Sequence, residues 1–205
     1  MDEQVKQIIV ESYNTNKELR DVDTISLLQQ KELDKFIEAT SHIKNARILD
    51  LGAGSGIYAK YFKNQGLDIT CIDISPGMVE LCLKKNLQAK VMDFYDLKYE
   101  DNTYDAIWSM NALLHVPKSN IDVVLSEVKR TLKDNGIFYL GILGGESFEG
   151  IYEKDFYKPK RYFSYYTNNE LKDLIERYFY IEYFDNVDVG NEHLFYQSII
   201  IRNIP

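Results

Sequence analysis

From residue 47 onward, short apolar runs alternate with amphipathic segments, and this alternation constrains the fold more than any other feature of the sequence. The apolar runs have the length of buried strands and cover residues 47–51, 68–74, 89–94, 104–110 and 136–143. Between them, apolar residues recur at helical spacing over residues 57–64, 78–85 and 121–132. Strands that alternate with helices predict an α/β fold with a doubly wound, mostly parallel sheet.

The C-terminal part of the chain follows a different pattern. A helix is predicted over residues 168–177, with Thr167 as its N-cap. Two strand-like runs, 180–184 and 194–201, follow with no helix between them. A parallel connection needs a crossover of a dozen or more residues, so these runs predict an antiparallel hairpin that completes a seven-stranded, Rossmann-like sheet.

The length of the chain, 205 residues and 24.0 kDa, suits one domain. Helical periodicity over residues 4–13 and 25–39 predicts two N-terminal helices that cover the body. We therefore expect a single domain over residues 1–205, divided into a helical cover at 1–45, a binding core at 46–145, a lid-like insertion at 146–167, and a final helix and hairpin at 168–205.

Composition narrows the classes of partner. A net charge of −8 and a pI near 5.0 disfavour nucleic acids and anionic membranes, and favour a small molecule. No apolar run is long enough to span a bilayer, no signal peptide is recognisable, and no metal site is indicated. We expect a cytoplasmic protein in which Cys71 and Cys82 are buried, reduced thiols. The sequence does not indicate an oligomeric state.

A glycine-rich loop follows the first predicted strand. Glycine lacks the Cβ that would keep a ligand away from the backbone, so Gly52-Ala53-Gly54-Ser55-Gly56 between a strand and a helix indicates close approach of a ligand. Dinucleotide-binding proteins place a third glycine where this chain has Ile57. That difference, together with the terminal hairpin, counts against an NAD-dependent oxidoreductase.

Three carboxylates stand near the ends of three consecutive predicted strands, where open α/β sheets bind ligands: Asp50, Asp73 and Asp93. Asp73 lies about 21 residues beyond Gly52, a spacing at which a carboxylate accepts hydrogen bonds from ribose hydroxyls. Asp93 is a candidate acceptor for an adenine amino group. The alternative for each aspartate is a turn-capping role.

Five segments together form a family pattern: ILDLGAGSG at 48–56, CIDISPGM at 71–78, MDF at 92–94, YDAIWS at 104–109 and LHVP at 114–117. They resemble the class I S-adenosylmethionine-dependent methyltransferases of the bacterial small-molecule type. The resemblance implies S-adenosylmethionine as cofactor and a small-molecule methyl acceptor. Methylation of nucleic-acid bases is disfavoured, because the amino-group base methylases share a polar-Pro-Pro-aromatic motif where this chain has Ser109-Met110-Asn111-Ala112.

The same resemblance implies a role for each cofactor-site residue. The methionine moiety would meet the loop Gly52, Ala53 and Gly54, and Asp50 would hold its amino group. Asp73 would bind the ribose. The adenine would lie between Ile74 and Met78, with Asp93 and Phe94 beside it, while Met110 and Asn111 would lie near the sulfonium. Residues 153–171 are similar to the substrate lid of a subgroup of these enzymes.

Methyl transfer depends mainly on alignment of the nucleophile with the methyl group and the departing sulfur, an effect worth about 7 to 11 kcal/mol. A general base is needed only when an O, N, S or C nucleophile must lose a proton. His115 and Tyr13 are the candidates, although His115 also suits a structural role, and Tyr13 suits a packing role with its hydroxyl at the surface. A non-catalytic S-adenosylmethionine-binding module would have the same cofactor residues and remains the alternative function.

Overall fold

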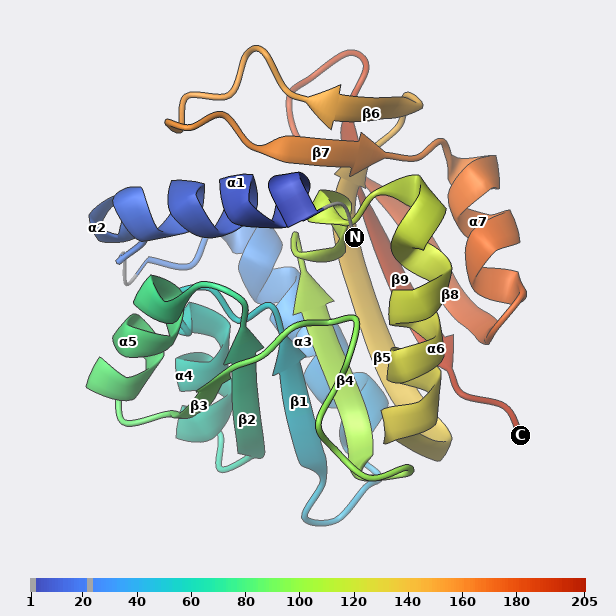
Figure 1. Cartoon of the computed structure of the whole chain (residues 1–205). Helices are drawn as coiled ribbons and strands as arrows, with labels where there is room; N and C mark the ends of the chain where they lie inside the picture. The colour runs from blue at the N-terminus through green and yellow to red at the C-terminus, as the bar shows by residue number, and fades with distance from the viewer. Residues whose placement is uncertain (1–2, 22–23) are drawn as a thin grey trace.

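The computed structural model describes residues 3–21 and 24–205, and a seven-stranded sheet forms its centre (Figure 1). The strand order is β3-β2-β1-β4-β5-β9-β8. The strands are β1 (Arg47–Leu51), β2 (Asp68–Asp73), β3 (Gln88–Val91), β4 (Tyr104–Met110), β5 (Leu132–Gly144), β8 (Tyr180–Asp188) and β9 (Phe195–Arg202). The first five strands run parallel, and β9 runs antiparallel to both β5 and β8, which confirms the predicted fold class and the terminal hairpin.

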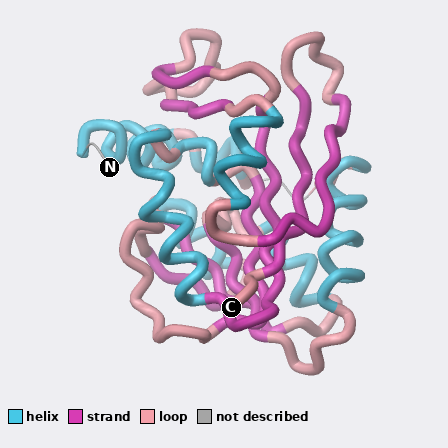
Figure 2. The backbone as a smooth tube through the Cα atoms, turned by 90° about the vertical axis from the view of Figure 1, so that its right-hand side faces the viewer, coloured by secondary structure: helices cyan, strands magenta, loops and turns pink. Residues whose placement is uncertain are grey.

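Helices pack on both faces of the sheet (Figure 2). One face carries α3 (Leu27–Thr40), α4 (Ile57–Asn64) and α5 (Pro76–Lys84), and the other carries α6 (Ile121–Thr131) and α7 (Asn168–Glu176). The N-cap predicted at Thr167 is confirmed, because Thr167 forms a capping box with Glu170. At the start of α5, the Ser75 hydroxyl accepts from the Met78 N–H.

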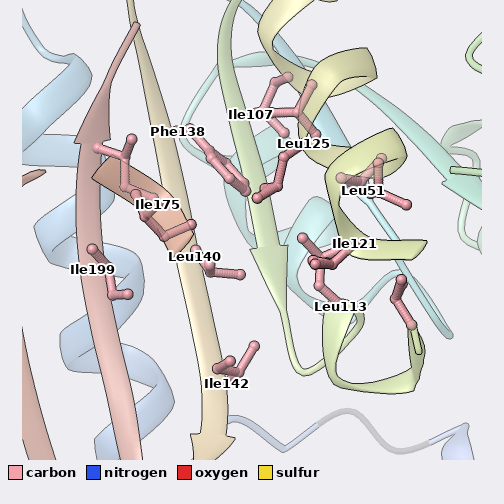
Figure 3. Close-up of a cluster of buried hydrophobic side chains, with 14 of the residues drawn as sticks. Leu51, Ile107, Leu113, Ile121, Leu125, Phe138, Leu140, Ile142, Ile175 and Ile199 are labelled. Atoms are coloured by element: carbon pink, nitrogen blue, oxygen red, sulfur yellow. The ribbon is translucent and has the colours of Figure 1, made fainter. Parts of the chain in front are cut away.

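The sheet separates two hydrophobic clusters. On the α6 and α7 side, Leu125 and Ile175 pack against Phe138 and Ile199 of the sheet (Figure 3). On the other side, Phe36 of α3 packs with Phe62, Trp108 and Tyr139, and the last two rings are stacked at 4.1 Å. Successive side chains of a strand point to opposite faces of the sheet. Since each face is covered by one of the two clusters, the central strands are buried on both faces. This packing holds the strand ends, and the loops beyond them, in place.

Additional elements lie across the carboxyl ends of the parallel strands (Figure 1). They are the helices α1 (Glu3–Thr15) and α2 (Lys17–Arg20), the short 3-10 helices η1 (Leu113–His115) and η2 (Lys118–Asn120), and the strands β6 (Phe148–Ile151) and β7 (Tyr162–Tyr165). Strands β6 and β7 form a separate antiparallel pair within the expected lid-like insertion. This hairpin was not predicted.

One strand boundary differs from the prediction in a way that concerns the site. Strand β3 ends at Val91 rather than at Phe94, so Asp93 lies in the following loop. The reason is that β3 is an edge strand whose single partner, β2, ends at Asp73 opposite Val91. Cys71 and Cys82 are buried free thiols, as predicted. Within residues 3–21 and 24–205, no helix has the length and apolar character to cross a membrane.

Candidate functional site

The glycine loop turns sharply between β1 and α4. Gly52 and Gly54 have φ angles of +82° and +54°, in the left-handed region that favours glycine. The N–H groups of Gly52 and Ala53 both donate to the carbonyl of Ile72, at 2.9 Å each, which ties the loop to the end of β2. A Cβ on Gly52 would lie 2.3 Å from the Cβ of Ala112, so this position has no room for a side chain.

Asp73, at the end of β2, is held by backbone donors. Its two carboxylate oxygens accept from the N–H of Gly54 at 2.9 Å and from the N–H of Ser75 at 2.8 Å. Burial raises the pKa of Asp73 to about 6, although these hydrogen bonds act in the opposite direction. The carboxylate is therefore oriented before any ligand binds, and each oxygen retains a lone pair for a further donor.

Asp50, within β1, has an unsatisfied oxygen. The side chain is buried, and its Oδ2 has no hydrogen-bond partner among the described residues. Burial raises the pKa of Asp50 well above its usual range, and the nearby charge of Asp73 adds to that effect. An unpaired buried carboxylate is costly, and a ligand with an ammonium group would satisfy it. This donor requirement fits the amino group of S-adenosylmethionine.

A cavity of about 400 Å³ opens beside the loop, at the carboxyl ends of β1, β2 and β4. Ten of the residues singled out from the sequence line it: Tyr13, Gly52, Ala53, Gly54, Asp73, Ile74, Phe94, Met110, Asn111 and His115. Asp50 and Met78 are buried and do not line it. Asp93 forms an ion pair with Lys6 of α1.

Tyr13 and His115, which also line the cavity, form a hydrogen-bonded pair. The carbonyl of Tyr162 lies 2.7 Å from His115 Nδ1 and can only accept, so Nδ1 carries the proton. His115 Nε2 must then accept from the Tyr13 hydroxyl, at 2.8 Å. Of the two roles left open for Tyr13, the packing role with a surface hydroxyl is wrong, because Tyr13 lines the cavity and its hydroxyl is bonded to His115.

Arg161 completes this group of polar residues. Its guanidinium forms a two-point ion pair with Asp155, with N···O distances of 2.9 Å, and donates to the Tyr13 hydroxyl at 3.1 Å. Burial lowers the pKa of His115 to about 3, and the Arg161 charge contributes. Burial raises the pKa of Tyr13. Near neutral pH, both side chains are therefore uncharged.

Helix α1 is fastened over the cavity by its polar side chains. The side-chain oxygen of Asn14 accepts from the Ser75 hydroxyl at 2.7 Å and from the Gly77 N–H at 2.9 Å, at the start of α5. The Lys6–Asp93 ion pair holds the other end of the helix. The site is thus enclosed by the N-terminal cover that the sequence predicted.

Several cavity residues were not predicted as cofactor or catalytic residues. They are Arg20, Gln29, Tyr58, Arg161 and Tyr196, and each reaches the cavity from an element outside the family-like segments. A basic residue or a tyrosine outside a motif carries no local signal of its place in the fold. Among these five, only Arg161 falls within residues 153–171, the stretch that is similar to a substrate lid.

Residues 49–140 match the sequence profile of a methyltransferase-domain family. This match includes the glycine loop, Asp73 and Asp93, and it supports the predicted resemblance to the class I S-adenosylmethionine-dependent methyltransferases. It is 35% identical over 101 residues to a sarcosine/dimethylglycine N-methyltransferase from Aphanothece halophytica, covering 45% of this chain and 36% of that protein. It is 26% identical over 162 residues to a ubiquinone biosynthesis O-methyltransferase from Xanthomonas oryzae pv. oryzae, covering 67% of each.

Among solved structures, the chain is similar to 1,6-didemethyltoxoflavin-N1-methyltransferase from Burkholderia thailandensis, in a structure with bound 1,6-didemethyltoxoflavin and S-adenosylhomocysteine. The TM-score is 0.80 at 18% identity, and the match covers 100% of this chain and 91% of that one. At this identity the likeness establishes the fold. The chain spans about a third of the length of the Aphanothece relative, so its own activity is a matter for proposal.

Proposed function

We propose that the protein transfers the methyl group of S-adenosylmethionine to a nucleophilic N or O atom of a small molecule. The observation that carries this proposal is one cavity lined by two groups of residues. The Gly52–Gly54 loop and Asp73 form the proposed cofactor end, and the Tyr13–His115 pair forms the proposed acceptor end. A cofactor bound at the loop and an acceptor beside the pair would then share one enclosed space. The similar proteins include N- and O-methyltransferases, which supports both types of acceptor.

The cofactor would be held by the residues that the sequence singled out. The Asp73 carboxylate would accept from the ribose hydroxyls, and the buried Asp50 carboxyl would interact with the amino group from behind the cavity wall. Ile74 and Phe94 would contact the adenine from the cavity wall, with Met78 behind the wall. Met110 ends β4, Asn111 follows it, and both would lie near the sulfonium. Asp93 would contribute through the loop that it shares with Phe94, held by Lys6.

The cofactor supplies an activated methyl group, so the task of the chain is to align the acceptor and to exclude water. In the transfer, the acceptor's lone pair forms the new bond to carbon as the carbon–sulfur bond breaks, and S-adenosylhomocysteine leaves. Helix α1 closes the cavity over this reaction, which favours alignment in a dry site. An amine in its free-base form, or a hydroxyl compound that binds as its anion, needs no proton removed before it attacks.

The Tyr13–His115 pair would position the acceptor rather than remove its proton. With a pKa of about 3, His115 is a weak base. Its neutral Nε2 accepts a hydrogen bond from the Tyr13 hydroxyl. Arg161 donates to the same hydroxyl oxygen. These two contacts hold the Tyr13 oxygen in place. The oxygen can then accept a hydrogen bond from an N–H or O–H group of the small molecule that receives the methyl group.

Several further aspects of the function rest on the sequence. An acidic chain with a net charge of −8 favours a small acceptor over nucleic acid. We propose a cytoplasmic location, where reduced thiols such as Cys71 and Cys82 are stable. A non-catalytic module that binds S-adenosylmethionine is the alternative, and it would keep every cofactor contact.

The test is a methyl-transfer screen with radiolabelled S-adenosylmethionine and small amines and phenols, beside calorimetry with S-adenosylhomocysteine. We expect the protein to bind S-adenosylhomocysteine and to label at least one acceptor, and expect the Asp73→Ala variant to lose both properties at the same cofactor concentration. Binding of NADH in place of S-adenosylhomocysteine would overturn the proposal. Tight binding without transfer to any acceptor would favour the non-catalytic module.

A further inference from the structure

A buried chain of hydrogen bonds runs from helix α3 to the cavity. Glu32 is 1% exposed, and its Oε2 accepts from the Tyr139 hydroxyl at 3.0 Å and from the Ser198 hydroxyl. The Tyr139 oxygen lies 2.8 Å from the Tyr196 oxygen. Tyr196, on β9, lines the cavity. The cofactor contacts proposed above make no use of this chain.

The chemistry of the groups gives the chain a direction. Glu32 is ion-paired with Lys35, at 2.9 Å from Oε1, and an ionised carboxylate can only accept hydrogen bonds. The single hydroxyl hydrogen of Tyr139 is therefore directed at Glu32. Tyr196 must then donate its own hydrogen to the Tyr139 oxygen. Burial raises the pKa of both tyrosines well above the usual range, so both hydroxyls keep their hydrogens.

A glycine in the middle of β5 makes room for the two hydroxyls. A Cβ on Gly141 would lie 1.6 Å from the Tyr196 oxygen and 2.7 Å from the Tyr139 oxygen. Glycine weakens a strand interior and often marks a close approach by another group. Gly141 is paired with Met110, and its carbonyl accepts from the Asn111 N–H at 2.7 Å. The hydroxyls thus lie beside the part of β4 assigned to the reacting methyl group.

Tyr196 also approaches the cavity from the side away from the cofactor loop. Strands β4 and β5 lie between β1, which carries the glycine loop, and β9, which carries Tyr196. Neighbouring strands are about 4.8 Å apart, so the two backbones are separated by roughly 14 Å. A cofactor on the loop leaves this end of the cavity for the acceptor.

We infer that Tyr196 is a specificity-determining residue of the acceptor site, whose oxygen accepts a hydrogen bond from the acceptor molecule because its own hydrogen is committed to Tyr139. The substrate class is then a small amine or hydroxyl compound that directs an N–H or O–H group at Tyr196. An ether or carbonyl oxygen at the same place would face a lone pair of the Tyr196 oxygen and could not form a hydrogen bond with it. This step rests on the proposed function, in that the acceptor occupies this end of the cavity.

Phenol and anisole test the inference, because they differ in the donor hydrogen but share the ring. Their affinities are measured by NMR titration of the protein, with and without saturating S-adenosylhomocysteine. We expect the wild type to prefer phenol by about tenfold, the scale of one net hydrogen bond. In Tyr196→Phe the preference should fall to within about twofold. Tyr58→Phe is the matched control, since Tyr58 also lines the cavity and its hydroxyl belongs to a separate contact with Gln29.

Glu32→Gln tests the direction of the chain without changing its shape. Lys35 can only donate, so the amide oxygen should stay beside Lys35 and the amide nitrogen should replace Oε2. The nitrogen would then donate to Tyr139, Tyr139 to Tyr196, and the Tyr196 hydrogen would turn into the cavity. A hydroxyl that donates serves anisole as well as phenol, so we expect the preference to fall below about twofold although Tyr196 is intact.

The outcomes separate this inference from the proposed function. A wild type with no phenol preference, or a Tyr196→Phe variant that keeps it, overturns the role of Tyr196. The role of Tyr196 is also overturned if Tyr196→Phe binds S-adenosylhomocysteine more weakly and keeps the phenol preference. The hydroxyl would then belong to the cofactor site. Failure of the wild type to bind S-adenosylhomocysteine overturns the proposed function instead, and the phenol preference is still measured in the free protein. Thermal melting of each variant establishes that the compared proteins are folded.

Discussion

The two ends of the cavity are built from contacts of different range along the chain. At the cofactor end, the Gly54 N–H and the Asp73 carboxylate that it binds are 19 residues apart. At the acceptor end, Tyr13 and His115 are 102 residues apart, Tyr13 and Arg161 are 148 apart, and Glu32 and Ser198 are 166 apart. The glycine loop and Asp73 of the cofactor end are thus a local motif on one βαβ unit, whereas the acceptor end exists only when the whole chain is folded.

This difference leads us to expect that the two ends respond separately to substitution. Changes at the cofactor end should affect the loop itself and the affinity for S-adenosylhomocysteine. Changes at the acceptor end should affect acceptor selection and turnover. A substitution that affects both ends equally would contradict the division.

The largest effect is expected for Gly52→Ala. The φ of +82° costs an L-residue about 1 to 2 kcal/mol, and the 2.3 Å contact with the Ala112 Cβ adds about 1 to 3 kcal/mol of overpacking. We therefore expect the free energy of unfolding to fall by about 2 to 5 kcal/mol, measured by urea denaturation of the free protein.

Gly54→Ala is the matched control for that substitution. Its φ is also positive, at +54°, but the nearest atom to an added Cβ is a guanidinium nitrogen of Arg20 at 3.9 Å. Only the cost of the positive φ applies, so the free energy of unfolding should fall by about 1 to 2 kcal/mol. Equal losses in the two variants would mean that the close approach to Ala112 does not determine the shape of the loop.

Asp73→Ala comes next in size and concerns the ligand. Hydrogen bonds to a charged group contribute about 1.5 to 3 kcal/mol, so the affinity for S-adenosylhomocysteine should fall by roughly ten- to 150-fold in calorimetry. Acceptor preference should stay the same once the cofactor is saturating. A folded Asp73→Ala variant with wild-type affinity would remove this residue from the site.

The same contrast explains which parts of the molecule the sequence predicted. Helix 57–64 and strand 104–110 were predicted with the bounds that the structure has, because each is a run of uniform periodicity flanked by turn residues. The hairpin of β6 and β7 was missed because Phe148–Ile151 is short, partly exposed and interrupted by Gly150. Its pairing depends on residues 162–165, across a loop with no regular pattern.

The candidate site divides in the same way. The loop and Asp73 were predicted because a strand, a glycine run and an acidic residue at fixed spacing form one local signal. For Tyr13 the sequence left two roles open, a base at the cleft or a packing residue with a surface hydroxyl. Nothing near it in sequence indicates that Arg161 and His115 meet its hydroxyl. Tyr196 was not considered for the site, since its place is set by strand order and by the gap at Gly141.

Tyr13→Phe tests the acceptor end and should have a smaller effect than Asp73→Ala. Removing one hydroxyl that accepts from Arg161 and donates to His115 should lower kcat/KM for the acceptor by about three- to tenfold, equivalent to ~0.7 to 1.4 kcal/mol. The S-adenosylhomocysteine affinity should remain within twofold. A variant that loses cofactor affinity but keeps acceptor kinetics would assign Tyr13 to the cofactor end.

The smallest expected effect is a pH dependence confined to one end. Asp73, with a pKa near 6, must be ionised to accept from both ribose hydroxyls, so protonation should weaken binding as the pH falls below 6. We expect S-adenosylhomocysteine affinity to fall by up to about tenfold from pH 7 to pH 5 in wild type through Asp73. Asp73→Asn should remove this part of the pH dependence and leave only the contribution of the buried Asp50. His115, with a pKa near 3, and Tyr13, with a raised pKa, should not titrate in this interval, so kcat at saturating cofactor should show no histidine inflection near pH 6.5. An inflection there that disappears in His115→Asn would show that His115 gains a proton during turnover, and would make it the base rather than a positioning residue.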